Sequence, residues 1–273
     1  MHIALGLFFS WLLIATPVLN SPVSFQQVME RSTATADEII RYGDAKPQFI
    51  ELYLPADADA NTPLVVYLHG GCWQNSFSVD HARGFADGTR AEGFAVALVE
   101  YRRLGDDGGG WPGTLDDIIL AIETLTEHRE LGYQPQSFAL VGHSAGGHLA
   151  LLASQPQRRL PIRGVLGLAA ITDIETYAAG ESGCQQAGAR FIATAASEVD
   201  AMNPVKQSQH SLVFLLRGDQ DTIVGEEQQQ FDGAQIIVIP GTGHFDVIHP
   251  ETEAFAQVLA TIRSLYPEFT RYL

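Results

Sequence analysis

Short apolar runs along this chain alternate with segments that have a helical pattern. Buried strands are predicted where four to six apolar residues follow one another, as at 64–68. An amphipathic helix is predicted over 114–128, where one face is formed by Leu115, Ile118, Ile119, Ile122 and Leu125. The predicted strands are 38–42, 49–54, 64–68, 94–99, 138–141, 164–169, 212–216 and 235–239, with further helices over 80–91, from 145 and from about 250. This alternation predicts one α/β domain over 37–273 with a mostly parallel sheet flanked by helices.

Two parts of this pattern depart from simple alternation. The strands at 38–42 and 49–54 are expected to form an antiparallel hairpin around Gly43 and Asp44. The stretch 174–203 lies between two strands and is too long for a simple crossover. We expect one connecting helix there, with a small lid insertion at about 175–196.

The N-terminus is strongly apolar. The first 25 residues contain no Asp, Glu, Lys or Arg, and 3–19 is almost wholly hydrophobic. Residues 1–20 therefore resemble a secretory signal or a short anchor, although no Lys or Arg precedes the run. Export to the periplasm or beyond, or membrane anchoring through this segment alone, is predicted. The alternative is a cytoplasmic protein with a hydrophobic extension packed on the domain. Residues 21–36 read as a linker.

Composition narrows the classes of partner. The net charge of −16 argues against a nucleic-acid ligand, because phosphate binding needs clustered Lys and Arg. The two cysteines, Cys72 and Cys184, are too few for a disulfide framework, and two free buried thiols are favoured over a pair. No cysteine or histidine spacing points to a metal site, and no cofactor is expected.

The residues Gly142-His143-Ser144-Ala145-Gly146 form a G-x-S-x-G motif between a predicted strand and a predicted helix. In that context the motif predicts a nucleophile elbow, a tight turn that exposes the serine hydroxyl at the sheet edge. Glycines are needed where strand and helix pass too closely for a Cβ. Ser144 is therefore the candidate nucleophile.

A serine nucleophile needs a base and an acid, which on such a sheet follow in the order Ser, Asp or Glu, His. His244 lies directly after the last predicted strand and is the predicted base; His249 reads as a residue at a helix start. Asp221 and Asp219 both follow the strand 212–216, and the spacing of Asp221 favours it. Asp246 is too near His244 in sequence, and Asp173 follows an earlier strand.

The oxyanion that forms during acyl transfer needs backbone donors. One is expected from Ala145, the residue after the nucleophile. Others are expected from Gly71 and Cys72, with Gly70 as an alternative, in the glycine-rich loop after strand 64–68. His69 is expected to brace that loop through hydrogen bonds.

The motifs His69-Gly70-Gly71-x-Trp73 and Gly142-x-Ser144-x-Gly146 together resemble the α/β-hydrolase fold esterases of the HGG type, above all small carboxylesterases and kynurenine-formamidase-like enzymes. The resemblance covers about residues 45–265. It departs from the family at Cys72, at the glycine-rich 105–110 and at the N-terminus. Further matching segments are Glu100-Tyr101-Arg102-Arg103-Leu104, Trp111-Pro112-Gly113-Thr114-Leu115-Asp116-Asp117, Met202-Asn203-Pro204-Val205 and Gly243-His244-Phe245-Asp246.

The expected activity is hydrolysis of a small-molecule carboxylic ester through an acyl-enzyme. The alternative is an arylformamidase; a peptidase and a non-enzymatic binding module are weaker readings. Trp73, Trp111 and Tyr177 are candidate substrate-binding residues, each equally compatible with plain core packing. The oligomeric state is left open.

Overall fold

The computed structural model describes residues 21–31, 35–128 and 136–269. The predicted signal-like segment, residues 1–20, lies outside the described residues. Within the described part of the chain, no helix is both long enough and apolar enough to cross a bilayer.

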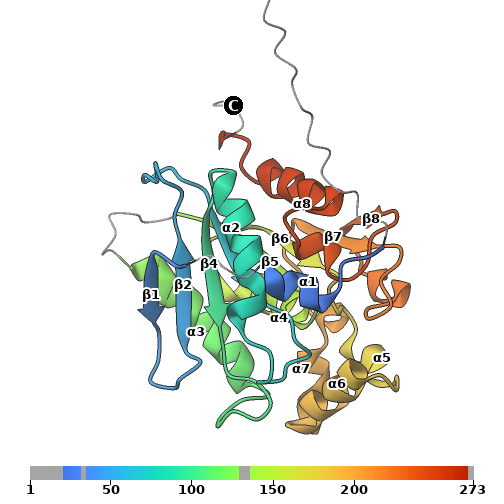
Figure 1. Ribbon diagram of the computed structural model, residues 1–273. Helices are drawn as coiled ribbons and strands as arrows, with labels where there is room; N and C mark the ends of the chain where they lie inside the picture. Colours follow the sequence, from blue (N-terminus) through green and yellow to red (C-terminus); the bar gives the residue numbers. More distant parts are fainter. Residues whose placement is uncertain (1–20, 32–34, 129–135, 270–273) are drawn as a thin grey trace, which may run out of the picture.

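The described strands form one eight-stranded sheet in the order β1-β2-β4-β3-β5-β6-β7-β8 (Figure 1). β1 and β2 are antiparallel to their neighbours, as the predicted hairpin requires, and the remaining neighbours are parallel. This is the predicted mostly parallel sheet. The strands are β1 (Glu38–Arg41), β2 (Phe49–Tyr53), β3 (Leu64–Leu68), β4 (Ala95–Glu100), β5 (Phe138–His143), β6 (Ile162–Leu168), β7 (Val213–Gly218) and β8 (Gln235–Ile239).

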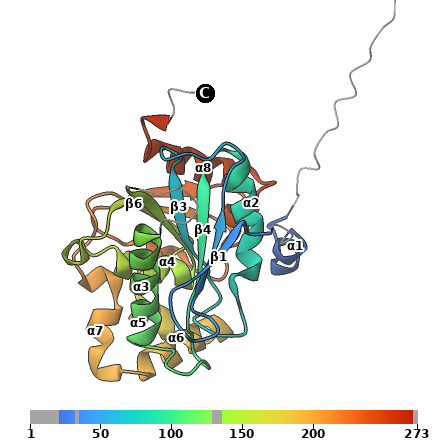
Figure 2. The same cartoon turned by 90° about the vertical axis from the view of Figure 1, so that its left-hand side faces the viewer.

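Helices cover both faces of the sheet, with α2 and α3 on opposite sides of it (Figure 2). The α-helices are α1 (Phe25–Glu30), α2 (Arg83–Ala91), α3 (Gly113–Glu127), α4 (Ala145–Ala153), α5 (Ile174–Ala178), α6 (Gly183–Ala193), α7 (Val199–Met202) and α8 (Glu253–Ser264). The 3-10 helices are η1 (Val79–Ala82), η2 (Pro156–Arg158), η3 (Ala196–Glu198), η4 (Pro204–Lys206), η5 (Glu226–Gln229) and η6 (Asp246–Ile248).

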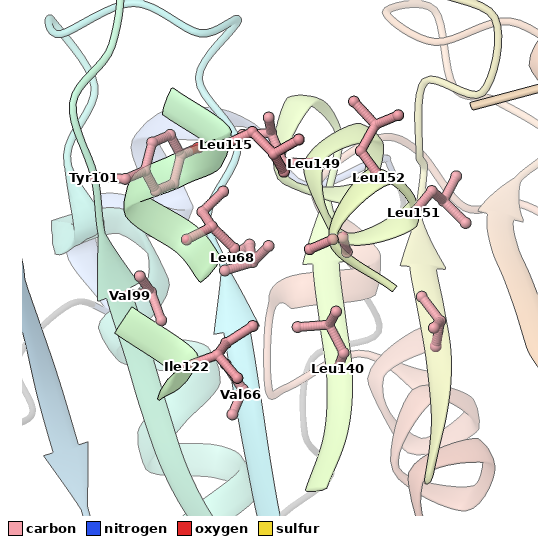
Figure 3. Close-up of a cluster of buried hydrophobic side chains, with 14 of the residues drawn as sticks. Val66, Leu68, Val99, Tyr101, Leu115, Ile122, Leu140, Leu149, Leu151 and Leu152 are labelled. Atoms are coloured by element: carbon pink, nitrogen blue, oxygen red, sulfur yellow. The ribbon is translucent and has the colours of Figure 1, made fainter. Parts of the chain in front are cut away.

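Two hydrophobic cores explain why the central strands are continuous apolar runs. Alternate residues of a strand point to opposite faces, so a strand covered on both sides needs apolar residues throughout. In β3, Val66 and Leu68 join the core beneath α3 and α4 (Figure 3), whereas Val65 and Tyr67 join the core beneath α2 and α8.

Two sequence expectations need correction. Residues 21–36 contain helix α1, and Val23 and Val28 are buried against the domain, so this stretch is not a simple linker. The stretch 174–203, expected to hold one connecting helix and a small lid insertion at about 175–196, holds three α-helices, because Asp173 caps α5 and Ser182 starts α6 with a capping box. That these helices act as a lid stays a prediction. These helices, α5 to α7, gather below the sheet in Figure 1.

Candidate functional site

Ser144 occupies the turn between β5 and α4. Its backbone has φ 55° and ψ −120°, a strained conformation for a residue with a side chain. A Cβ on Gly142 would lie 2.2 Å from the Gly146 oxygen, and a Cβ on Gly146 would lie 2.1 Å from the Leu68 oxygen. Both glycines are therefore required by close backbone contact, as the elbow motif predicts.

Asp221 and His244 meet at the carboxyl ends of neighbouring strands β7 and β8. The Nδ1 atom of His244 lies 2.8 Å from Oδ2 of Asp221, and both residues are buried. The other carboxylate oxygen of Asp221 accepts the backbone N–H groups of Ile223 and Val224, at 2.8 and 2.9 Å. Burial alone would raise the pKa of Asp221, but the hydrogen bond and charge interaction with His244, followed by the two backbone N–H groups, hold it below its usual 3.8. A charged acceptor thus faces Nδ1 of His244.

The competing residues have other partners. Asp219 accepts the N–H of Gly241 at 2.7 Å, and Asp173 caps helix α5. Asp246 accepts the N–H groups of Val23 and Gly243, each at 3.0 Å. Nδ1 of His249 accepts the N–H of Glu251 at 3.3 Å, near the start of α8. Among these aspartates, Asp221 is the one bonded to His244.

His143, inside the elbow, links the serine turn to the loop after β8, residues 240–246, which carries His244 and which we call the histidine loop. Its Nε2 lies 3.0 Å from the carbonyl oxygen of His244, and the two rings are 4.5 Å apart. Burial lowers the pKa of His143 well below 6.5, so the ring is neutral and Nε2–H donates to that carbonyl. No local pattern indicates this contact, because the two residues are 101 positions apart.

The loop after β3 lies directly beside Ser144. A Cβ on Gly70 would lie 3.2 Å from the serine Cβ. The next three residues, Gly71, Cys72 and Trp73, all have positive φ, at 108°, 55° and 55°. Residues with positive φ continue neither a strand nor a right-handed helix, so the N–H groups of this run lie outside regular secondary structure and remain candidate oxyanion donors. Ala145 is the first residue of α4, so its N–H has no acceptor within the helix. The N-terminus of a helix also stabilises a negative charge.

His69 braces this loop, as expected. Its ring is fully buried, with Nδ1 at 2.7 Å from the Gly70 oxygen and Nε2 at 3.0 Å from Oε1 of Glu100. It stacks on Tyr101, whose hydroxyl donates to the His69 oxygen at 2.6 Å. Glu100 also pairs with Arg103 at 2.7 Å. The sequence does not predict the contact between His69 and Glu100, because the sequence pattern shows Glu100 only as the residue at the end of a strand.

Cys72 and Cys184 form a disulfide, with their Cα atoms 5.1 Å apart. The expectation of two free thiols was therefore wrong. The bond joins the loop after β3 to helix α6. The two cysteines are 112 residues apart in sequence, so their spacing alone does not predict that they pair.

The aromatic candidates are placed differently from one another. Trp73 and Tyr177 are buried, at 0% and 1% exposure, with the Trp73 ring stacked 5.5 Å from Phe191 of α6. Their side chains thus pack the loop against α5 and α6, which does not support direct contact with substrate. Trp111 is partly exposed and donates its indole N–H to Glu198 at 2.8 Å. Its role in substrate binding stays a prediction.

In the residues that the structure describes, no three His, Cys, Asp or Glu side chains gather so as to hold a metal ion. The site contains a serine on a strained turn, a histidine bonded to a charged aspartate, and a neighbouring loop of three consecutive residues with positive φ. Such a set can perform nucleophilic acyl transfer.

Comparisons with known proteins identify the family of the chain. The family model described as BD-FAE matches residues 50–231. Carboxylesterase NlhH from Mycobacterium tuberculosis is 34% identical over 113 residues, covering 40% of this chain and 34% of that protein. Kynurenine formamidase from Danio rerio is 31% identical over 114 residues, covering 41% and 36%. The chain thus spans about a third of the length of these relatives.

Among solved structures, esterase B from Lactobacillus rhamnosis superposes with a TM-score of 0.73 at 20% identity, covering 89% of this chain and 90% of that one. Likeness at this level of identity establishes the fold. The protein therefore has the α/β-hydrolase fold that the sequence motifs implied.

Proposed function

Because the chain belongs to the BD-FAE family, whose model matches two thirds of it, we propose that it is a serine hydrolase that cleaves small-molecule carboxylic esters. The observation that carries this proposal is the 2.8 Å hydrogen bond between Asp221 and His244, whose loop is bonded through the His244 carbonyl to His143, the neighbour of a serine held in a strained elbow. The similarity to a carboxylesterase over 40% of the chain supports the ester as substrate class.

In the proposed first half-reaction, Ser144 Oγ attacks the ester carbonyl carbon while Nε2 of His244 takes the hydroxyl proton. Charged Asp221 holds Nδ1–H of His244 and stabilises the imidazolium that forms. The oxyanion is stabilised by the backbone N–H groups of Gly71, Cys72 and Ala145, with Gly70 as an alternative donor. The imidazolium then protonates the leaving alcohol, and the acyl group stays on Ser144.

In the second half-reaction, His244 removes a proton from water, which attacks the acyl carbon. The second tetrahedral intermediate uses the same backbone donors. When it collapses, the proton returns from His244 to Ser144 Oγ and the carboxylic acid leaves. The balanced result is ester plus water giving acid plus alcohol.

The test is Ser144→Ala, with exposed Ser211→Ala as the matched control. We expect kcat on a p-nitrophenyl ester to fall about 10⁴- to 10⁶-fold in Ser144→Ala, because the covalent intermediate can no longer form. A fluorophosphonate probe should label the wild type and Ser211→Ala but not Ser144→Ala. Turnover near the wild-type rate in a folded Ser144→Ala protein would refute the proposal.

A formamide is the second candidate substrate, and the similarity to a kynurenine formamidase supports it. The same residues would then attack the formyl carbon and release an amine. A panel of p-nitrophenyl esters of rising chain length, assayed beside N-formylkynurenine, separates the two. A higher kcat/KM on the formamide than on every ester would favour this alternative.

We further propose that the protein is exported, or anchored by residues 1–20. The apolar N-terminus and the disulfide between Cys72 and Cys184 both support this, because disulfides persist in oxidising compartments. Mass spectrometry of the N-terminus of the protein recovered from its native compartment tests it. If processing occurs, we expect the mature chain to begin at or before Ser21, so that Val23 keeps its bond to Asp246. Recovery from the cytoplasm alone, with the cysteines reduced, would contradict it.

A further inference from the structure

The short segment formed by residues 22–30, which we call the N-terminal strap, contacts the loop that carries His244. The N–H of Val23 donates to Oδ2 of Asp246 at 3.0 Å, and the same oxygen accepts the N–H of Gly243 at 3.0 Å. A Cβ on Gly243 would lie 2.5 Å from Cβ of Pro22, so the strap is in close contact with the residue before His244. The turn from Gly243 to Asp246 contains the proposed base, His244. A single oxygen of Asp246 therefore closes this turn and also holds the strap against it.

The strap also contacts the segment that follows the loop after β3, residues 69–73, which we call the oxyanion loop because it carries the proposed oxyanion donors. The ring of Phe25 is 5.6 Å from that of Phe77 and 5.6 Å from that of Phe245. Phe77 packs on the oxyanion loop, because a Cβ on Gly71 would lie 2.4 Å from its Cβ. Phe245 directly follows His244, and their rings are 5.0 Å apart. Phe25 thus bridges the two loops that supply the proposed base and the oxyanion donors.

The strap owes its structure to this docking. Helix α1 has six residues, and a helix that short is unstable by itself in water. A capping box between Ser24 and Gln27 starts the helix, and Val23 and Val28 are both 3% exposed. Arg31, just after the helix, pairs with Glu251 at 3.2 Å. These contacts fix a chain segment more than 200 residues away in sequence from the loop it touches.

We propose that the N-terminal strap is a positioning element of the catalytic site, with Phe25 of the strap and Asp246 of the histidine loop as the positioning residues. The inference rests on the proposed function. The strap fixes the separation between the histidine loop and the oxyanion loop, and therefore the approach of His244 to Ser144. Because misplacement of a catalytic group by about 1 Å can cost about 100-fold in rate, losing this bridge should lower kcat rather than weaken substrate binding.

The first test compares Phe25→Ala, the conservative Phe25→Tyr and the control Met29→Ala. Met29 lies on the same helix but is 41% exposed. We expect kcat per fluorophosphonate-titrated site to fall about tenfold in Phe25→Ala with KM changed less than twofold. Phe25→Tyr and Met29→Ala should keep wild-type kcat. Wild-type kcat in Phe25→Ala, or an equal loss in Met29→Ala, would overturn the proposal.

The second test is at Asp246. Asn keeps an acceptor oxygen for the two N–H groups and Ala removes it, so Asp246→Ala should lose more kcat than Asp246→Asn. Because Phe25 and Asp246 act through the same bridge, the double variant Phe25→Ala/Asp246→Ala should lose less than the product of the single losses. Equal losses in Asp246→Ala and Asp246→Asn, or fully multiplicative losses in the double variant, would overturn the proposal.

The two proposals fail in different ways. If the proposed function is wrong, the wild type neither hydrolyses esters or formamides nor reacts with the fluorophosphonate at Ser144. If only the strap proposal is wrong, the wild type is active, Ser144→Ala is inactive, and the strap variants keep wild-type kcat.

Discussion

At the residue scale, the site depends on which of two nearby aspartates orients His244. Asp221 directs one carboxylate oxygen to His244 and the other to two backbone N–H groups. Asp219 is exposed and holds the turn at Gly241. Their spacing of two residues is a small difference in sequence, but it places one carboxylate inside the site and the other on the surface.

We therefore expect Asp221→Asn to lower kcat by about 10³- to 10⁴-fold, because an amide can no longer hold the imidazole in the right tautomer or stabilise its charge. Asp219→Asn is the matched control and should keep kcat within about threefold of the wild type, since an amide oxygen can still accept the Gly241 N–H. Steady-state kinetics on one ester compares them. A larger loss of kcat in Asp219→Asn than in Asp221→Asn would show that Asp221 is not the acid.

At the scale of elements, helix α6 is covalently tied to the oxyanion loop. The Cys72–Cys184 disulfide adds to the stacking of Trp73 on Phe191, so two contacts of different kinds join the same pair of elements. The helices of 174–203 are thereby held beside the loop, rather than joined to the domain only through their chain ends.

The double variant Cys72→Ser/Cys184→Ser should lower the free energy of unfolding by about 2–4 kcal/mol, because the bond closes a long loop in the unfolded chain. Urea unfolding with and without dithiothreitol measures this. The reductant should destabilise the wild type to a similar extent and leave the double variant unchanged. An unfolding midpoint of the wild type that does not respond to reductant would contradict the prediction.

At the scale of the whole molecule, buried neutral histidines make stability depend on pH. Burial lowers the pKa of His81 to about 3 and that of His148 to about 4, and also lowers the pKa of His143. Both hydrogen bonds of the His148 ring require its neutral form, because Nε2–H donates to the Met202 carbonyl oxygen at 2.7 Å and Nδ1 accepts the indole N–H of Trp73 at 3.3 Å.

The direction of this pH dependence follows from the difference in proton binding between the unfolded and the folded chain. In the unfolded chain these histidines bind protons near pH 6.5, whereas in the fold they remain neutral to lower pH. Their contribution to stability is therefore complete above pH 6.5 and is lost as pH falls toward about 4, by up to about 1.4 kcal/mol per pH unit for each histidine. Urea unfolding at several pH values between 7 and 4 should show this decline, with a shallower slope in His148→Gln. An equal slope in that variant would contradict the assignment.

The sequence by itself determined the features that depend on local pattern. The runs that became β3 and β5 are apolar because both faces of the sheet are covered, and the elbow glycines are set by contacts inside one strand-turn-helix unit. The order of Ser144, Asp221 and His244 followed from the strands that precede them. Their catalytic roles stay predictions.

Only the tertiary structure decided which distant segments meet. It paired Cys72 with Cys184, buried Trp73 and Tyr177, bonded His143 to the His244 carbonyl, and docked residues 22–30 on the histidine loop. The strap had a local signal, the capping box of Ser24 and Gln27, but nothing local indicates where a six-residue helix will dock. Periodicity reports which face of an element is buried, whereas the partner it is buried against is set by the packing of the whole chain.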